Sequence, residues 1–338
     1  MADNQGLAGA AADAPVARLG KKMKATTLII IMLSLALLGT LFFGYLYLQR
    51  SVPPGLNMLV TTAKKPLNRP PSFLGHLQPP PEGKFSNPLG VAAAEDGRLF
   101  IADSGASEIK VFTPDGKFSG KFGQHGKGAG ELEYPTDLAV RAGKVYVADF
   151  KNNRIAVFKT DGTFEKNMAQ GPGNAGISPL AVDVDEKGYV YLADRSHRVV
   201  VLDDKGQFVR AFGEGGSGDG QMSYPNGIAV ARDGTIYVSD SGNGRVEYFD
   251  QAGRFLGKID GFVTPRGITL DESGRLYVVD PLTHTVSVYS QDRKPLFTFG
   301  SRGVDNGQFN FPNGVAVDNQ GRILVTDREN DRVCIWNY

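Results

Sequence analysis

The stretch Tyr224-Pro-Asn-Gly-Ile-Ala-Val-Ala-Arg-Asp-Gly-Thr-Ile-Tyr-Val-Ser-Asp-Ser-Gly-Asn-Gly-Arg-Val-Glu-Tyr-Phe249 decides the fold of this chain. Three short runs, residues 227–231, 235–239 and 245–249, are separated by Asp-Gly and by Ser-Gly-Asn-Gly. Such runs between turn residues are typical of β-strands joined by tight turns. A fourth run begins at Arg254, so the stretch predicts one four-stranded antiparallel sheet. A single small sheet does not bury its faces alone, and further copies are therefore expected.

The same pattern recurs six times between residue 73 and the end of the chain. A proline precedes the first run of each copy, at intervals of 40–47 residues: Pro88, Pro135, Pro179, Pro225, Pro265 and Pro312. An aspartate ends the second run of each copy: Asp103, Asp149, Asp194, Asp240, Asp280 and Asp327. The residues ahead of these aspartates are apolar on both strand faces, as in a strand packed between neighbouring sheets. Six such units predict an all-β fold, a six-bladed β-propeller of four-stranded blades.

These motifs make the chain similar to the NHL-repeat family. The similarity is carried by Pro225-Asn-Gly-Ile-Ala-Val230, by Pro312-Asn-Gly-Val-Ala-Val317, by the Val-Ala-Asp strand end and by Asn153-Arg-Ile155. It extends over residues 73–338, the part predicted to form the propeller. The resemblance implies the propeller fold, and it implies several functions, because the family includes binding modules, RNA-binding proteins and zinc-dependent peptide lyases.

The sixth copy stops after its third strand, Arg332-Val-Cys-Ile-Trp336. The segment Ser72-Phe-Leu-Gly-His-Leu77 precedes the first proline in the position where a fourth strand precedes the others. We expect this segment to complete the last blade, which would close the ring and remove two sheet edges.

The first 72 residues predict a tail, a membrane anchor and a linker. Residues 1–24 are expected to form a disordered cytoplasmic tail. Residues 25–48 contain no charge, and a helix of this length spans a hydrocarbon core of roughly 30 Å, so we expect a transmembrane signal-anchor helix rather than a buried core helix or a cleaved signal peptide. Basic residues ahead of the span favour a cytoplasmic N-terminus, and residues 49–72 predict a proline-rich linker. The propeller is thus expected at the cell membrane on its extracytoplasmic side.

Composition excludes some functions. The formal net charge of +1 disfavours nucleic-acid binding, which usually requires a basic excess, and it conflicts with the RNA-binding reading of the family. Cys334 is the only cysteine, so neither an intrachain disulfide nor a multi-cysteine metal site is possible.

Most residues that could carry chemistry have a structural interpretation. The six strand-ending aspartates are expected to accept N–H groups of the following turn. In three copies the aspartate is also expected to pair with the arginine five residues on, as Asp149 with Arg154, which would contribute about 0–1 kcal/mol if the pair is exposed. Glycine-rich segments beginning at Gly123 and Gly213 lack a P-loop ending and are interpreted as blade crossings. An acidic group, Asp183, Asp185 and Glu186, is interpreted as an ordinary hairpin rather than a calcium site. The histidines are expected to lie on the surface: His76, His125, His197 and His284.

The residues that differ between copies are the candidates for a grafted site. They follow the repeat proline or the strand-ending aspartate, and both positions are expected at one mouth of the channel. The predicted ligand-binding residues are Asp137, Phe150, Arg195, Asn226, Arg266, Asn313 and Arg328. The leading hypothesis is a non-enzymatic binding or scaffold module for a protein, peptide or envelope component, without a cofactor. The alternative is a lyase or hydrolase with zinc or calcium in the central channel.

Overall fold

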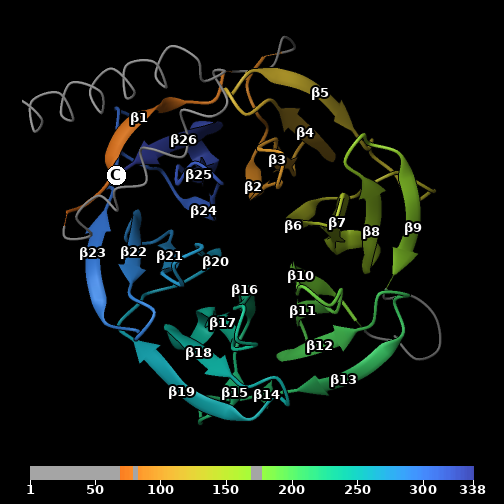
Figure 1. Ribbon diagram of the computed structural model, residues 1–338, viewed down its shortest axis with the longest axis vertical. Coiled ribbons are helices and arrows are strands. Elements are labelled where there is room, and N and C mark those ends of the chain that lie inside the picture. Colours follow the sequence, from red (N-terminus) through yellow and green to blue (C-terminus); the bar gives the residue numbers. More distant parts are fainter. Residues whose placement is uncertain (1–68, 79–82, 169–176) are drawn as a thin grey trace, which may run out of the picture. The chain divides into compact units, whose positions relative to one another are not determined.

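The computed structural model describes residues 69–78, 83–168 and 177–338, which belong to one compact unit, Pro66–Tyr338. The described residues form six four-stranded antiparallel sheets around a central channel (Figure 1), so the predicted six-bladed propeller is confirmed. The predicted tail, the anchor helix 25–48 and the linker up to residue 68 lie outside the described residues. Within the ranges that are described, no helix is long and apolar enough to cross a membrane.

Each blade runs from an inner strand at the channel to an outer strand at the periphery. Blade 1 contains β2 (Pro88–Ala93), β3 (Leu99–Asp103), β4 (Glu108–Phe112) and β5 (Phe118–Phe122). Blade 2 contains β6 (Pro135–Arg141), β7 (Lys144–Asp149), β8 (Arg154–Lys159) and β9 (Phe164–Met168). Blade 3 contains β10 (Pro179–Val184), β11 (Val190–Asp194), β12 (Arg198–Leu202) and β13 (Phe208–Phe212). Blade 4 contains β16 (Pro225–Val230), β17 (Ile236–Asp240), β18 (Arg245–Phe249) and β19 (Phe255–Asp260). Blade 5 contains β20 (Ile268–Leu270), β21 (Leu276–Asp280), β22 (Thr285–Tyr289) and β23 (Pro295–Phe299). Blade 6 contains β24 (Pro312–Val317), β25 (Ile323–Asp327), β26 (Arg332–Asn337) and β1 (Ser72–His76).

Blade 4 shows how closely the strands follow the repeat pattern. Its inner strand β16 begins at the repeat proline, two residues before the predicted start, and β17 ends on Asp240 as the pattern indicates. The strand β18 has the predicted bounds. The glycine-rich segment before this blade is a crossing, as predicted, and contains the short parallel pair β14 (Glu214–Gly215) and β15 (Gln221–Met222).

The last blade is closed by both ends of the propeller, as predicted. β1 pairs antiparallel with β26, and the N–H of Leu77 donates to the carbonyl of Val333 at 3.0 Å. Leu77 is buried, and the Phe73 ring lies edge-on to the Trp336 ring. The N-terminal and C-terminal strands of the propeller therefore belong to one sheet and contribute to one hydrophobic core.

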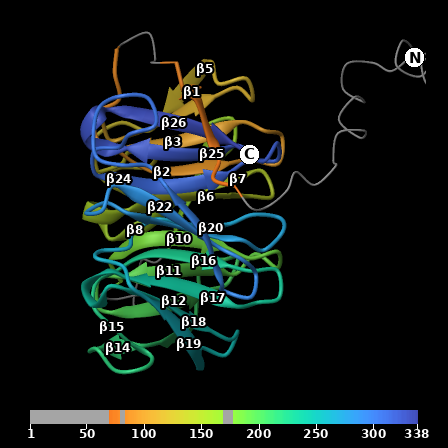
Figure 2. The same ribbon diagram turned by 90° about the vertical axis from the view of Figure 1, so that its left-hand side faces the viewer.

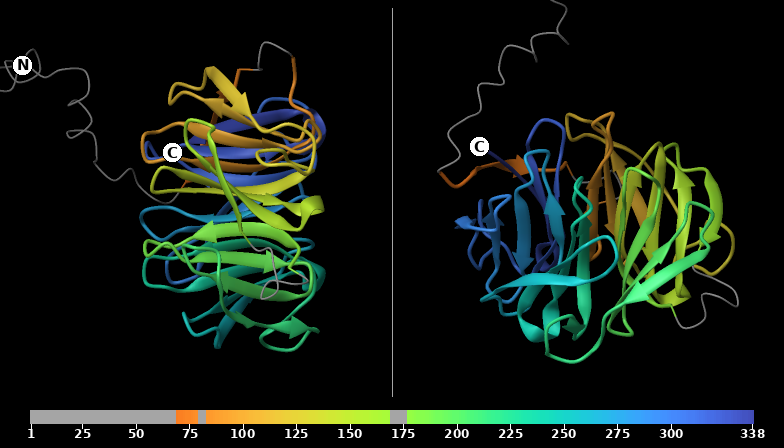
Figure 3. Two further views of the ribbon diagram at one scale, coloured as in Figure 1. Left: turned by 90° about the vertical axis from the view of Figure 1, so that its right-hand side faces the viewer. Right: turned by 60° about the horizontal axis from the view of Figure 1, so that its bottom comes forward.

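The hydrophobic core lies between the blades. Figures 2 and 3 view the ring from its sides and show neighbouring blades lying face against face. The second strands are buried along their whole length in β3, β11, β17, β21 and β25. One core cluster joins Tyr191 and Val199 of blade 3 to Ile228 and Val238 of blade 4. Burial on both faces explains why the pattern Tyr-Val-Ala is continuous rather than alternating.

The strand-ending aspartates bind backbone, but mainly in a different place from the predicted one. Each accepts an N–H from the crossing that enters its own inner strand, one or two residues ahead of the repeat proline. The donors, at 2.6–2.8 Å, are Ser86, Glu133, Ser178, Ser223, Val263 and Asn310. Among the described residues, backbone of the following turn donates at Ser196 and Leu282. The aspartates thus tie the crossing to the second strand, which fixes the start of each inner strand.

The predicted pairs between a strand-ending aspartate and the arginine five residues on are confirmed, and in blades 2 and 4 the arginine is buried. In blades 2, 4 and 6 an arginine Nε lies 2.6–2.9 Å from the strand-ending carboxylate: Arg154, Arg245 and Arg332. Their other N–H groups donate to three carbonyls of the long crossing ahead of the blade. The crossing into blade 5 is short, and its aspartate, Asp280, has no basic partner among the described residues.

Candidate functional site

The propeller has two faces, one at each end of its inner strands. The channel-mouth face carries the starts of the inner strands, the blade crossings and the turns between second and third strands. The hairpin face carries the turns between first and second strands. Residues of the two faces come from the same blades, but the connections that form them have different lengths and compositions.

The residue after each repeat proline forms a ring at the channel mouth. One half of this ring is apolar or weakly polar and the other half is polar: Leu89, Thr136 and Leu180, then Asn226, Arg266 and Asn313. The structure brings Arg266 and Asn313 together, since Arg266 Nη1 donates to Asn313 Oδ1 at 3.1 Å. Asn226 is instead occupied within its own blade, where its Nδ2 donates to Ser241 Oγ at 2.9 Å.

The other predicted rim residues belong to the turns around this ring. Phe150 begins the short helix η2 (Phe150–Asn152), and Arg328 begins η5 (Arg328–Asn330). Arg328 pairs with Glu329 at 2.7 Å and lies over the Phe311 ring. Arg195 is exposed in the turn after Asp194. These side chains lie in blades 2, 3 and 6, so they surround the mouth rather than form one cluster.

Asp137 does not belong to the rim, although the sequence placed it there. It lines a cavity of about 520 Å³ inside the channel, which reaches the hairpin face at Glu95, Glu186 and Glu272. The ring residues at the channel mouth do not line this cavity. Asp137 is thus one position deeper than the predicted site, in a cavity that the ring residues do not line.

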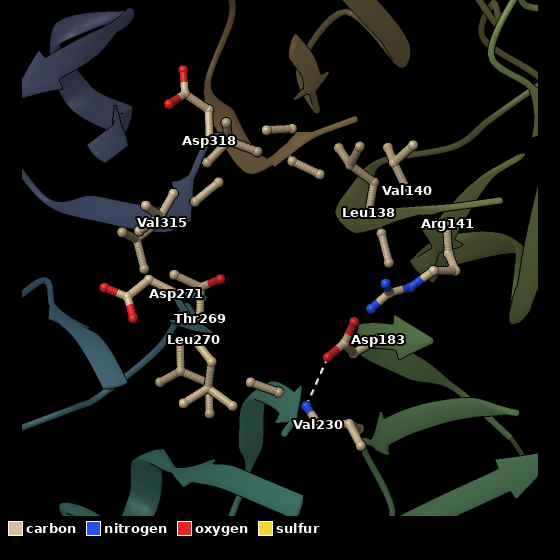
Figure 4. A pocket seen from close by; sticks show the side chains of 18 of the residues that line it. Leu138, Val140, Arg141, Asp183, Val230, Thr269, Leu270, Asp271, Val315 and Asp318 are labelled. Atoms are coloured by element: carbon tan, nitrogen blue, oxygen red, sulfur yellow. Dashed lines mark hydrogen bonds between the residues drawn. The ribbon is translucent and has the colours of Figure 1, made fainter. Parts of the chain in front are cut away.

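Two carboxylates on neighbouring inner strands are the main polar groups in this cavity. Asp137 Oδ2 accepts the N–H of Val182 at 3.1 Å, and Asp183 Oδ2 accepts the N–H of Val230 at 2.7 Å. Each bond joins one blade to the next. Figure 4 shows the second of these bonds, with Arg141 pointing toward Asp183 from the neighbouring strand. The carboxylates satisfy inner-edge N–H groups that have no strand partner.

The surrounding protein raises the pKa of both groups. Burial raises the pKa of Asp137 to about 7, helped by the negative charge of Asp183 and opposed by N–H groups of Val182 and Leu138. Burial likewise raises the pKa of Asp183 to about 6, against its backbone hydrogen bonds and Arg141. The side chains of Asp137 and Asp183 are partly exposed to the channel and are otherwise enclosed by the blades. Ionisation of this pair near neutral pH therefore disfavours the folded state.

We expect Asp137→Asn to stabilise the propeller at pH 8. The folded-state pKa of about 7 exceeds the ordinary value of 3.8, so the proton on Asp137 favours folding below pH 4, and this contribution is lost as the pH rises through 7. Asparagine keeps an acceptor for the Val182 N–H and does not ionise. The gain should be about 1–4 kcal/mol at pH 8 and should largely vanish at pH 4, measured by denaturant unfolding.

Asp161→Asn is the matched control for this pH experiment. Asp161 is exposed in a turn, and the N–H of Thr163 lowers the pKa of its carboxyl group. Its substitution should bring no gain at pH 8. An Asp137→Asn effect that is the same at pH 4 and pH 8 would contradict the assignment of the cost to ionisation.

Comparison of the six copies could have revealed both channel carboxylates. Four blades have glycine where blade 2 has Asp137, and the remaining one has Ala181. Four blades have alanine and one has Thr269 where blade 3 has Asp183. Asp137 is among the residues predicted at the channel mouth, whereas Asp183 is predicted to belong to a hairpin. That assignment is correct for Asp185, whose Oδ1 accepts two N–H groups of its own turn.

The histidines hold backbone rather than forming a metal set. Nδ1 of His197 accepts the N–H of Tyr224, and Nδ1 of His284 accepts the N–H of Phe311, each at 3.1 Å across a blade boundary. His284 is buried, so the prediction of a surface histidine is wrong there, whereas His125 is exposed in a crossing as predicted. In the part of the chain that is described, no group of three or more His, Cys, Asp or Glu is arranged to hold a metal ion.

Comparisons with known sequences agree with the repeat structure. Residues 85–198 match a family described as a 6-bladed beta-propeller, and residues 222–249 and 309–336 match the NHL repeat. The chain is 35% identical over 127 residues to protein brain tumor of Drosophila melanogaster, covering 36% of this chain and 12% of that protein. It is 28% identical over 175 residues to NHL repeat-containing protein 3 of Mus musculus, covering 44% and 49%. The chain thus spans less than half the length of these relatives.

Comparisons with solved structures show the same fold at low identity. Virginiamycin B lyase from Staphylococcus aureus superposes with a TM-score of 0.55 at 14% identity, covering 80% of this chain and 99% of that one. The gluconolactonase XC5397 from Xanthomonas campestris gives 0.57 at 16%, covering 81% and 99%. At such identities the similarity concerns the fold alone. The family matches and the six blades together show that this chain is a six-bladed β-propeller that contains NHL repeats.

Proposed function

We propose that this chain is a membrane-tethered binding propeller that recognises a protein or peptide outside the cell membrane through its channel-mouth face. The sequence of residues 25–48 supports the tether, and the basic residues ahead of it support the orientation. The propeller supplies a rigid scaffold, on which connecting loops carry the contacts.

The distribution of exposed apolar side chains carries this proposal. Four large apolar side chains that are more than half exposed lie on the channel-mouth face: Tyr224, Val263, Leu282 and Val304. The hairpin face has Tyr189, at 37% exposed, and the other exposed apolar residues lie on outer strands. Aromatic and aliphatic side chains exposed together on one face mark a protein interaction surface.

The backbone of Val263 and the backbone of Leu282 meet at the side chain of Asp280. One carboxylate holds both: Asp280 Oδ2 accepts the N–H of Val263 at 2.6 Å, and its Oδ1 accepts the N–H of Leu282 at 3.2 Å. Blade 5 differs from its neighbours here, because its crossing is short and no arginine covers Asp280. Two exposed apolar residues are therefore held by their backbone N–H groups on one carboxylate.

Capture with a membrane-impermeant cross-linker, applied to intact cells that carry the full chain, tests the proposal. The double variant Val263→Asp, Leu282→Asp should lose a partner captured by the wild type by about tenfold or more, because charges replace apolar contacts. Phe208→Asp, on an exposed position of outer strand β13, should retain it. Melting temperatures of all proteins should agree.

Two results would contradict the proposal. Equal capture by the wild type and the double variant would exclude this face as the binding surface. A partner that cross-links only after cell lysis would exclude the extracytoplasmic location, while leaving the binding surface intact.

A further inference from the structure

Arg266 at the channel mouth is a partly buried cation without an anionic partner. Its guanidinium makes one hydrogen bond to a neighbouring side chain, to Asn313 Oδ1, and its Nε is buried without a hydrogen-bond partner. Among the described residues no carboxylate lies within ion-pair distance of it. The arginines on the third strands, such as Arg245, have both an aspartate and backbone carbonyls. Arg210 on the outer strand β13 likewise has a buried Nε without a hydrogen-bond partner, but of the two arginines Arg266 is the one at the channel mouth.

The surroundings of Arg266 increase its need for an anion. Burial, and to a smaller degree the positive charge of Arg328, lower the pKa of the Arg266 guanidinium. Arg328 is itself paired with Glu329, on the outer side of the mouth. A desolvated charge without a counter-charge is costly in a folded protein, and a ligand that supplies the counter-charge recovers that cost on binding.

The neighbouring side chains restrict what this anion is attached to. Thr136 and Leu180 of the mouth ring are partly exposed, whereas Leu89 is buried, and the exposed Val263 lies three residues before Arg266 in the same crossing. A compact anion with an apolar group attached matches both features. The planar guanidinium binds a carboxylate through two parallel hydrogen bonds, with Asn313 beside it as a further polar partner.

We propose that Arg266 binds a carboxylate of the partner, at an acidic side chain or a chain terminus adjoining an apolar residue. This inference rests on the proposed function, since it names the chemistry recognised by the same face. Arg266 is the point of charge recognition, and Val263 and Leu282 receive the adjoining apolar group.

Ligand-observed NMR on the full chain tests this chemistry with N-acetyl-leucine and its neutral amide. Saturation transfer to the leucine methyl groups, followed over a titration, should show that the acid binds about tenfold more tightly than the amide. Arg266→Gln should remove this preference. Arg254→Gln, at an exposed arginine in the turn between β18 and β19, should keep it. Inorganic phosphate should displace the acid only weakly.

Every other outcome overturns the assignment. Responses to the acid and the amide that do not differ, including no response to either, exclude a carboxylate site. Retention of the preference in Arg266→Gln places the site elsewhere, and displacement by phosphate at lower concentration than the acid assigns a phosphate site. If partner capture needs Val263 and Leu282 but tolerates Arg266→Gln, the proposed function stands and the carboxylate inference fails.

Discussion

A propeller that begins at Gly83 should be insoluble or should melt far below one that begins at Arg69, because the shorter chain lacks β1. Without this strand β26 becomes an open edge, and the Trp336 side chain loses the Phe73 ring that packs against it. The same closure makes Leu77 critical, since its side chain is only 3% exposed and its N–H bonds to Val333. Leu77→Ala in the full chain should lower the free energy of unfolding by about 2–5 kcal/mol.

Leu74→Ala separates closure from a general effect of changing β1. Leu74 lies on the same strand but is 57% exposed, so its loss should change stability by less than about 0.5 kcal/mol. Thermal and denaturant unfolding of the four proteins measure these differences. Equal melting of the proteins that begin at Arg69 and at Gly83 would show that the ring holds without its N-terminal strand.

Arg245→Ala should lower the free energy of unfolding by about 3–5 kcal/mol, far more than an exposed ion pair would. Arg245 Nε lies 2.9 Å from Asp240, its Nη2 lies 3.0 Å from Glu247, and its N–H groups also hold three carbonyls of the crossing before blade 4. Both carboxylates are fully buried. Removal of the guanidinium leaves the buried carboxyl groups of Asp240 and Glu247 without their counter-charge, and the carbonyls of Ser217 and Gln221 without this donor.

Arg254→Ala is the matched control on the same blade. Arg254 pairs with Asp250 at 2.6 Å, but its side chain is 82% exposed, so its loss should cost no more than about 1 kcal/mol. Urea unfolding followed by tryptophan fluorescence measures both variants. If Arg245→Ala and Arg254→Ala cost the same, the buried network does not hold the crossing.

The fold was predictable because it depends on local pattern repeated six times. The proline that begins a strand, the aspartate that ends one and the glycines of the turns each act within a few residues. Each copy therefore indicates the same strand order independently. The register of blade 4 was correct to within two residues for this reason. Closure of the ring also followed from counting, since one copy lacked a strand and one strand preceded the first copy.

The interior chemistry was less predictable because it depends on contacts between copies. The bond from Asp183 to Val230 crosses a blade boundary, as does the bond from His284 to Phe311. The sequence around Asp183 is typical of a local hairpin turn. Asp183 nevertheless lies on an inner strand, and its carboxylate lines the channel. Arg154 was correctly paired with Asp149, but its burial depends on the crossing loop that folds over it.

The sequence by itself determined the six blades, their strands and the closing strand, because turn residues and apolar periodicity act on neighbouring residues of the chain. It also named the residues around the channel mouth, since they differ between otherwise similar copies. Only the tertiary structure decided which of these residues share an environment. It moved Asp137 into the channel, left Arg266 enclosed beside Asn313 without a carboxylate, and held Val263 and Leu282 on one carboxylate. The physical reason is that burial and pairing of charge arise from blades that meet only when the ring closes.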